Sequence, residues 1–137
     1  MAFECGALGC SGGRSPLEAL GELLTHLESE DVDVSHGEIT QGERWAATTL
    51  KISRPGEAEL KQYVQVSVGG EILELTLEDA RGVLAEGELL GKDLMLTTTL
   101  SGVTDPVAND RIMAYALDEW QGIPWDETSG FITPQGS

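Results

Sequence analysis

The sequence predicts a single-domain α+β fold with a mostly antiparallel sheet, built from a three-stranded meander plus one further strand and covered on one face by about three helices. Two patterns support this class. Leucines recur at helical spacing near the N-terminus, and apolar and polar residues alternate over 46–76 and again over 94–100. A chain of 137 residues is a usual length for one domain, and it can bury a core without a metal or disulfide.

The first helix is expected from about residue 16 to residue 29. Ser15 and Glu18 can form a capping box, and Pro16 suits the first helical position. One apolar stripe follows, made of Leu17, Leu20, Leu23, Leu24 and Leu27. Residues 1–14 are small and Gly-rich, so we expect a Gly-rich N-terminal arm ahead of an α+β domain at residues 15–124.

A strand and a hairpin are expected after the first helix. One face of the expected strand carries Ala46, Thr48, Leu50 and Ile52. The strand ends at Arg54-Pro55-Gly56. Residues 61–76 predict a hairpin around a two-residue turn at Gly69-Gly70. That turn would pair Val68 with Glu71, Val66 with Leu73 and Val64 with Leu75, which places the aliphatic residues on one face.

Two more helices and a strand complete the predicted domain. Thr76 and Asp79 form a second candidate capping box, opening a helix that Gly82 and Gly87 weaken. Its inward residues are expected to be Leu77, Ala80, Val83 and Leu84. Residues 94–100 predict a strand, and Asp105-Pro106 begins a helix that runs to about Trp120. The stripe of this last helix is Met113, Ala116, Leu117 and Trp120, and residues 125–137 are expected to form an irregular C-terminal tail.

The charge excludes several classes of function. The chain has 24 acidic and 8 basic residues, and its formal charge is −16. Binding to nucleic-acid phosphates or to anionic lipid headgroups needs clustered Lys and Arg, so neither is expected. No apolar run approaches the ~20 residues that span a bilayer. The N-terminus lacks the basic and apolar regions of a signal peptide, so we expect a cytoplasmic protein or a virion component.

The charge is also unevenly distributed along the chain. Half of the basic residues fall in one window: Arg44, Lys51, Arg54 and Lys61. Residues 15–43 contain eight acidic residues and no basic one. This pattern predicts a surface with a strongly acidic helical side and a nearly neutral edge, an arrangement that can steer association between subunits.

No catalytic or metal-binding pattern is specific. The soft metal ligands are Cys5, Cys10, His26 and His36, whose spacing does not match a zinc site, so free thiols and no cofactor are expected. The segment from residue 9 to residue 15 lacks the first Gly and the Lys of a phosphate-binding loop. Acidic pairs such as Asp31/Asp33, Asp118/Glu119 and Asp126/Glu127 arise by chance among so many carboxylates. We therefore do not expect an enzyme.

The sequence favours a non-enzymatic structural or assembly protein that acts through protein contacts in a homo- or hetero-oligomer. A virion component with a halophile-like acidic surface is one form of this hypothesis, because salt screens the self-repulsion of so many carboxylates. The alternative is an acidic nucleic-acid mimic that binds the basic groove of a nucleic-acid-binding protein. Trp120 is expected in the core, and the expected interface residues are Leu17, Arg54, Lys61, Trp125 and Phe131.

Overall fold

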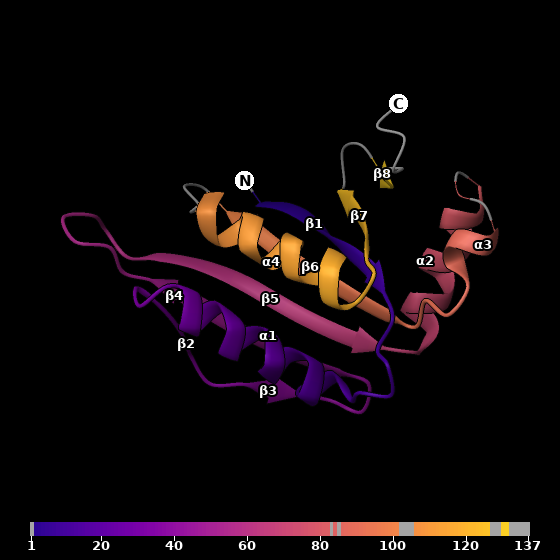
Figure 1. Ribbon diagram of the computed structural model, residues 1–137, viewed down its shortest axis with the longest axis horizontal. Coiled ribbons are helices and arrows are strands. Elements are labelled where there is room, and N and C mark those ends of the chain that lie inside the picture. The colour runs from indigo at the N-terminus through magenta and orange to yellow at the C-terminus, as the bar shows by residue number, and fades with distance from the viewer. Residues whose placement is uncertain (1, 83, 85, 102–105, 127–129, 132–137) are drawn as a thin grey trace.

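A computed structural model describes residues 2–82, 84, 86–101, 106–126 and 130–131 of the chain (Figure 1). The strands are β1 (Ala2–Gly9), β2 (Val34–His36), β3 (Thr40–Gln41), β4 (Trp45–Ile52), β5 (Leu60–Val68), β6 (Leu94–Ser101), β7 (Ile123–Asp126) and β8 (Gly130–Phe131). The helices are α1 (Pro16–Glu30), α2 (Glu71–Arg81), α3 (Glu86–Leu89) and α4 (Pro106–Glu119). The predicted α+β class and single small domain are confirmed.

One antiparallel sheet organises these elements. Its strand order is β2-β4-β5-β6-β1-β7-β8, and β3 pairs with β4. Helices α1 and α4 lie side by side against one face, in front of the sheet in Figure 1. The main core lies between them and the sheet, and its largest fully buried side chains include Leu20, Leu23, Leu50, Leu96 and Trp120.

The expectation that all helices cover the same face is wrong for α2. Neighbouring residues of β1 point to opposite faces of the sheet, with Ala7 in the main core and Leu8 in a second cluster. The second cluster joins Leu8 of β1, Met95 of β6 and Ile123 of β7 to the buried side of α2. Helix α2 therefore covers one end of the face that α1 and α4 leave uncovered. We call this second surface of the sheet the open face.

The predicted N-terminal arm is wrong, because residues 2–9 form β1 in the interior of the sheet. This strand pairs with β6 on one side and with β7 on the other. Neighbouring residues pack directly against the glycine backbone of β1. A Cβ on Gly6 would collide with the Leu96 carbonyl oxygen, and one on Gly9 would lie 2.9 Å from Trp120 Cβ. Composition alone predicted flexibility here, whereas the glycines serve close packing.

The predicted hairpin around Gly69-Gly70 is also wrong. Both glycines have positive φ, 67° and 94°, as such a turn requires, but Gly70 is the N-cap of α2. The chain enters a helix at Glu71, and β5 pairs instead with β4 and β6, so that Val66 lies opposite Leu96. The predicted start of a helix at Thr76 is wrong for the same reason, since Thr76 lies within α2.

Helix α1, strands β4 and β6 and helix α4 lie close to their predicted positions. Helix α1 has the capping box between Ser15 and Glu18, whose carboxylate accepts a hydrogen bond from the Ser15 backbone N–H. This hydrogen bond is the main reason that the pKa of Glu18 lies below its usual value. The predicted inward face of β4 is buried. The predicted inward residues Leu77 and Ala80 of α2 are buried as well, and so is Leu84, which lies after the end of α2. Val83 and Asp105 lie outside the described residues.

Two expectations for the C-terminal part of the chain are wrong. Leu117 was placed on the buried stripe of the last helix, but it is 41% exposed, while Trp120 is buried as expected. The irregular tail does not begin at residue 125, because Trp125 belongs to β7 and pairs with Gly6 of β1. Among the described residues, no helix is long and apolar enough to cross a lipid bilayer.

Candidate protein-binding groove

The open face carries polar and aromatic side chains on its β4–β5 side. Because cross-strand partners point to the same face, Trp45, Ser67, Met95 and Leu8 form one row across β4, β5, β6 and β1. Helix α2 covers Met95 and Leu8 at one end of this row but leaves Trp45 and Ser67 beside it. The uncovered part of the row forms a groove.

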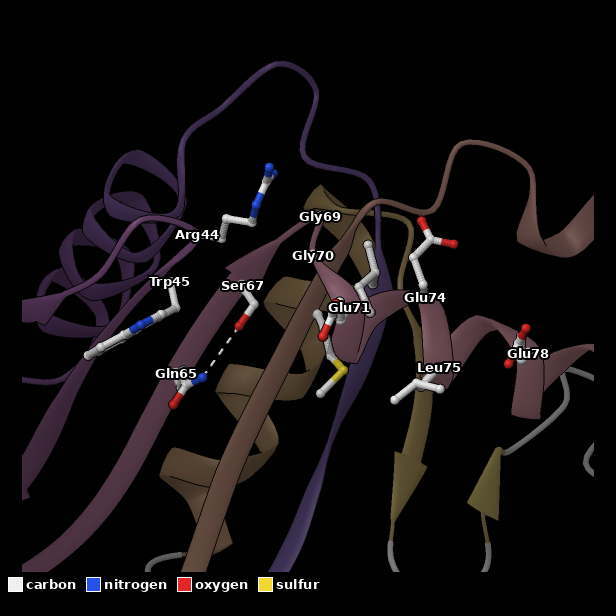
Figure 2. A pocket seen from close by; sticks show the side chains of 12 residues that line it. Arg44, Trp45, Gln65, Ser67, Gly69, Gly70, Glu71, Glu74, Leu75 and Glu78 are labelled. Carbon is white, nitrogen blue, oxygen red and sulfur yellow. Dashed lines mark hydrogen bonds between the residues drawn. The ribbon is translucent and has the colours of Figure 1, made fainter.

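The groove has a volume of about 790 Å³ and lies between the strands and α2 (Figure 2). Its strand side presents Trp45, Gln65, Ser67 and Met95. Its helix side presents Glu71, Leu73, Glu74, Leu75 and Glu78, and the turn before α2 adds Gly69 and Gly70. Arg44, which directly precedes β4, also lines the groove. Apolar and charged side chains therefore meet in one open depression.

The apolar lining of the groove is partly exposed to solvent. Leu75 is 61% exposed on α2, and Trp45 is 37% exposed on β4. The Trp45 indole packs against the backbone at Gly42, where a side chain with a Cβ would collide with the indole nitrogen. Met95 is held against α2 by the Thr76 hydroxyl, 3.5 Å from its sulfur. A partly exposed aromatic side chain beside an exposed leucine is typical of a surface that anchors a partner.

Polar side chains continue along β5 from the groove. The Tyr63 hydroxyl donates a hydrogen bond to Gln65 Oε1 at 2.9 Å, and Gln65 Nε2 donates to Ser67 Oγ at 3.4 Å. The second bond is drawn in Figure 2. This chain of hydrogen bonds orients the amide of Gln65 at the floor of the groove. Tyr63, which is 39% exposed, extends the aromatic surface along the open face.

The charged groups at the groove have no partner of opposite charge among the described residues. Glu71, Glu74 and Glu78 are exposed along one side of α2, and none of them makes an ion pair there. Arg44 lies over the turn, where a Cβ on Gly69 would be 3.2 Å from its Nη1, and it too is unpaired. Unpaired charges beside an exposed apolar surface are available to a partner.

The sequence patterns do not reveal the carboxylates of the groove, because the alternation over residues 71–76 predicts a strand. One signal was available. Glu71, Glu74 and Glu78 are spaced at i, i+3 and i+7, which places them on one side of a helix. Leu73, Leu77 and Ala80 show the same period on the buried side. The alternation of Leu73 and Leu75 obscured both patterns.

The predicted interface residues do not form one surface. Lys61 is exposed on the open face opposite Lys51, with neither lysine in an ion pair with a described residue. Leu17, 39% exposed, lines a depression between α1 and α4 on the other side of the sheet. Trp125 is half-buried over Gly6 and pairs in register with Phe131 of β8, whose side chain lies outside the described residues.

Arg54, the fifth predicted interface residue, has a structural role. Its guanidinium binds the Asp31 carboxylate at 2.8 Å and the Asp33 carboxylate at 3.1 Å, and Arg111 of α4 approaches Asp31 at 3.4 Å. The hydrogen bond from Arg54 is the main cause that lowers the pKa of Asp31 below its ordinary value. The acidic residues after α1 therefore connect that helix to the β4–β5 loop and α4.

The soft metal ligands are separated in the fold. Cys5 lies on β1 and Cys10 just after it, and neither is in a disulfide. The His26 ring packs against Tyr115 of α4 in a tilted arrangement, with the ring centroids 5.0 Å apart. His36 lies on β2 with its Nδ1 2.7 Å from a Glu28 carboxylate oxygen. Among the described residues, no group of three or more His, Cys, Asp or Glu side chains is placed to hold a metal ion.

The Gly-rich segment before α1 is held by a carboxylate of the protein itself. The Ser11 backbone N–H and hydroxyl both donate hydrogen bonds of 2.7 Å to Asp93, which lies just before β6. Ser11 is only 2% exposed. The segment therefore binds an internal carboxylate and secures the end of β1.

Comparisons of the chain with models of protein families, with curated proteins and with solved structures find no match.

Proposed function

We propose that this protein is a non-enzymatic assembly protein that contacts other proteins through its open face. The observation that carries this proposal is the groove between β4, β5, β6 and α2. It combines the exposed side chains of Trp45 and Leu75 with carboxylates that have no partner among the described residues. An interface typically centres on an aromatic or aliphatic anchor surrounded by polar groups, and this groove has that composition.

The open face also carries basic side chains that make no ion pair with a described residue. Arg14, Arg54 and Arg111 are engaged with carboxylates on the helical side. By contrast, Lys51 and Lys61 lie opposite each other on the open face without such a partner among the described residues. Directly opposed like charges are unfavourable on a sheet. A bound protein that supplies anionic groups there would relieve this repulsion.

Photo-crosslinking in the cells that make the protein tests the proposal. A photoreactive phenylalanine derivative replaces Leu75 on the groove in one variant and Leu117 on α4 in the matched control. Both leucines are exposed, so neither substitution disturbs the core. We expect discrete protein adducts, either with a second copy or with another protein, from position 75 and not from position 117.

Two results would contradict the proposal. Absence of protein adducts from position 75, with normal expression and folding, would remove the open face as a protein contact. Adducts confined to position 117 would place the contact on the acidic helical side instead. Mass spectrometry of the adducts distinguishes self-association from contact with another protein.

A further inference from the structure

We propose that the groove binds a cationic, amphipathic segment of a partner protein, with apolar side chains toward Trp45 and Leu75 and Lys or Arg side chains toward α2. This inference rests on the proposed function and adds the chemistry of the partner. The segment inserts its apolar side chains between the strands and α2, which is the way amphipathic helices bind in grooves of other proteins. The groove, the carboxylate row and the overall charge each support this occupant.

The apolar part of the groove sets the first requirement on the partner. Trp45 on the strand side, Leu75 on the helix side and Met95 between them offer contacts to one or two aliphatic or aromatic side chains. Leu75 is the most exposed of these three, at 61% of its surface. Burying it against a partner removes apolar surface from water, which is favourable. A purely hydrophilic cationic segment gains nothing from this contact.

The carboxylate row sets the second requirement. Glu71, Glu74 and Glu78 recur at i, i+3 and i+7, so they extend along roughly 10 Å of α2. Lys or Arg side chains with the same spacing on a partner helix lie opposite all three carboxylates. None of the three has an ion-pair partner among the described residues, so binding breaks no existing pair there.

The charge of the whole protein favours the same partner. A formal charge of −16 attracts cationic segments over long distances and raises their rate of association. This attraction alone would act at any acidic surface. The groove adds specificity, because the exposed apolar side chains of Trp45 and Leu75 lie beside its carboxylates. Arg44 beside the turn before α2 disfavours a cation at that end, which gives the bound segment a direction.

Fluorescence anisotropy with a defined probe tests this inference on the full chain. The probe is a labelled amphipathic helical peptide of lysine, leucine and alanine, and the control peptide has the same composition in an order without amphipathicity. The groove variant is E71Q/E74Q/E78Q. The matched control variant E57Q/D110N/D118N removes the same number of charges from exposed positions on the β4–β5 loop and α4.

We expect the groove variant to bind the amphipathic probe about tenfold more weakly than the wild type, because it loses three exposed charge pairs. The control variant should lose no more than about twofold, through the reduced long-range attraction. Leu75→Ser should weaken binding of the amphipathic probe about fivefold and leave the control peptide unaffected, because it removes apolar contact and no charge. Circular dichroism confirms that each variant is folded.

Three results would overturn the inference. Equal losses in the groove and control variants would reduce the binding to general attraction by an acidic surface. Equal affinity for the amphipathic probe and the non-amphipathic control peptide would show that binding does not need apolar side chains gathered on one side of the segment. Absence of binding to the wild type would exclude a cationic amphipathic segment. In each case the photo-crosslinking experiment decides about the proposed function. Protein adducts from position 75 would show that the groove contacts a partner of other chemistry. Absence of these adducts would overturn the proposed function as well.

Discussion

Replacing Gly6 by alanine tests whether the N-terminal residues form an interior strand. Gly6 lies on β1 between β6 and β7, and Trp125 covers it. An added Cβ would collide with the Leu96 carbonyl oxygen and lie 2.8 Å from its carbon and 3.0 Å from Trp125 Cζ2. The backbone of Leu96 cannot rotate away as a flexible side chain would. The strands must separate, or Trp125 must leave its place.

The expected cost follows from this geometry. Overpacking of a close-packed site costs about 1–3 kcal/mol, and weakening one or two strand hydrogen bonds adds about 1 kcal/mol. We therefore expect Gly6→Ala to lower the free energy of unfolding by about 2–4 kcal/mol. For a domain of this size, that corresponds to a fall in melting temperature of roughly 10 °C. If residues 1–14 formed an arm, the same change would be neutral or stabilise by up to about 1 kcal/mol.

Urea unfolding followed by tryptophan fluorescence and circular dichroism measures this difference. Gly21→Ala on α1 is the matched control, because no atom lies within 4 Å of the Cβ that it adds. We expect this control to raise the free energy of unfolding by about 0.5–1 kcal/mol, since alanine is the better helix former. A Gly6→Ala variant as stable as the wild type would refute the placement of β1.

Two further predictions concern the polar contacts that hold the fold together. Asp93→Ala leaves the buried Ser11 N–H and hydroxyl without their acceptor, so we expect a loss of about 2–3 kcal/mol in the free energy of unfolding; unchanged urea stability would contradict this role. Arg54→Met should cost about 1–3 kcal/mol near neutral pH, because among the described cations Asp31 then keeps only Arg111, at the longer distance of 3.4 Å. Because Arg54 lowers the pKa of Asp31, its contribution is fully present above the unfolded value of about 3.8 and disappears as the pH falls through the lower folded value. Urea titrations over this pH range should show the stabilities of wild type and variant converging below pH 3.8, and a constant difference would be evidence against this linkage.

Much of the α+β architecture was predictable because it depends on local patterns. The capping residues of α1 and the alternation of β4 and β6 specify each element without reference to its neighbours. The interior position of β1 was not predictable in this way. Gly6 and Gly9 reduce the intrinsic strand preference of the segment, and their fit against Trp125 and Trp120 exists only in the folded chain.

The groove was missed because two periods compete within one segment. Leu73 and Leu75 alternate as on a strand, and the preceding glycines have the positive φ of a hairpin turn. The helical period that includes Leu77 and Ala80 prevails, because β6 supplies the partner strand that the hairpin would have provided. The pairing of β5 with β6 joins segments that are far apart in the sequence, so a local pattern does not reveal it. Leu75 is consequently exposed beside the groove, where a strand would have buried it.

The account depends most on the groove as the place where a cationic amphipathic segment binds. Proton–nitrogen correlation spectra of the labelled protein, recorded while the lysine–leucine–alanine peptide is added, test this directly. We predict shifts of the Trp45 indole resonance and of the backbone amides of residues 65–78, with the buried Trp120 indole unchanged. Shifts centred on His26 and Tyr115, between α1 and α4, or spread evenly over the acidic surface, would contradict the account.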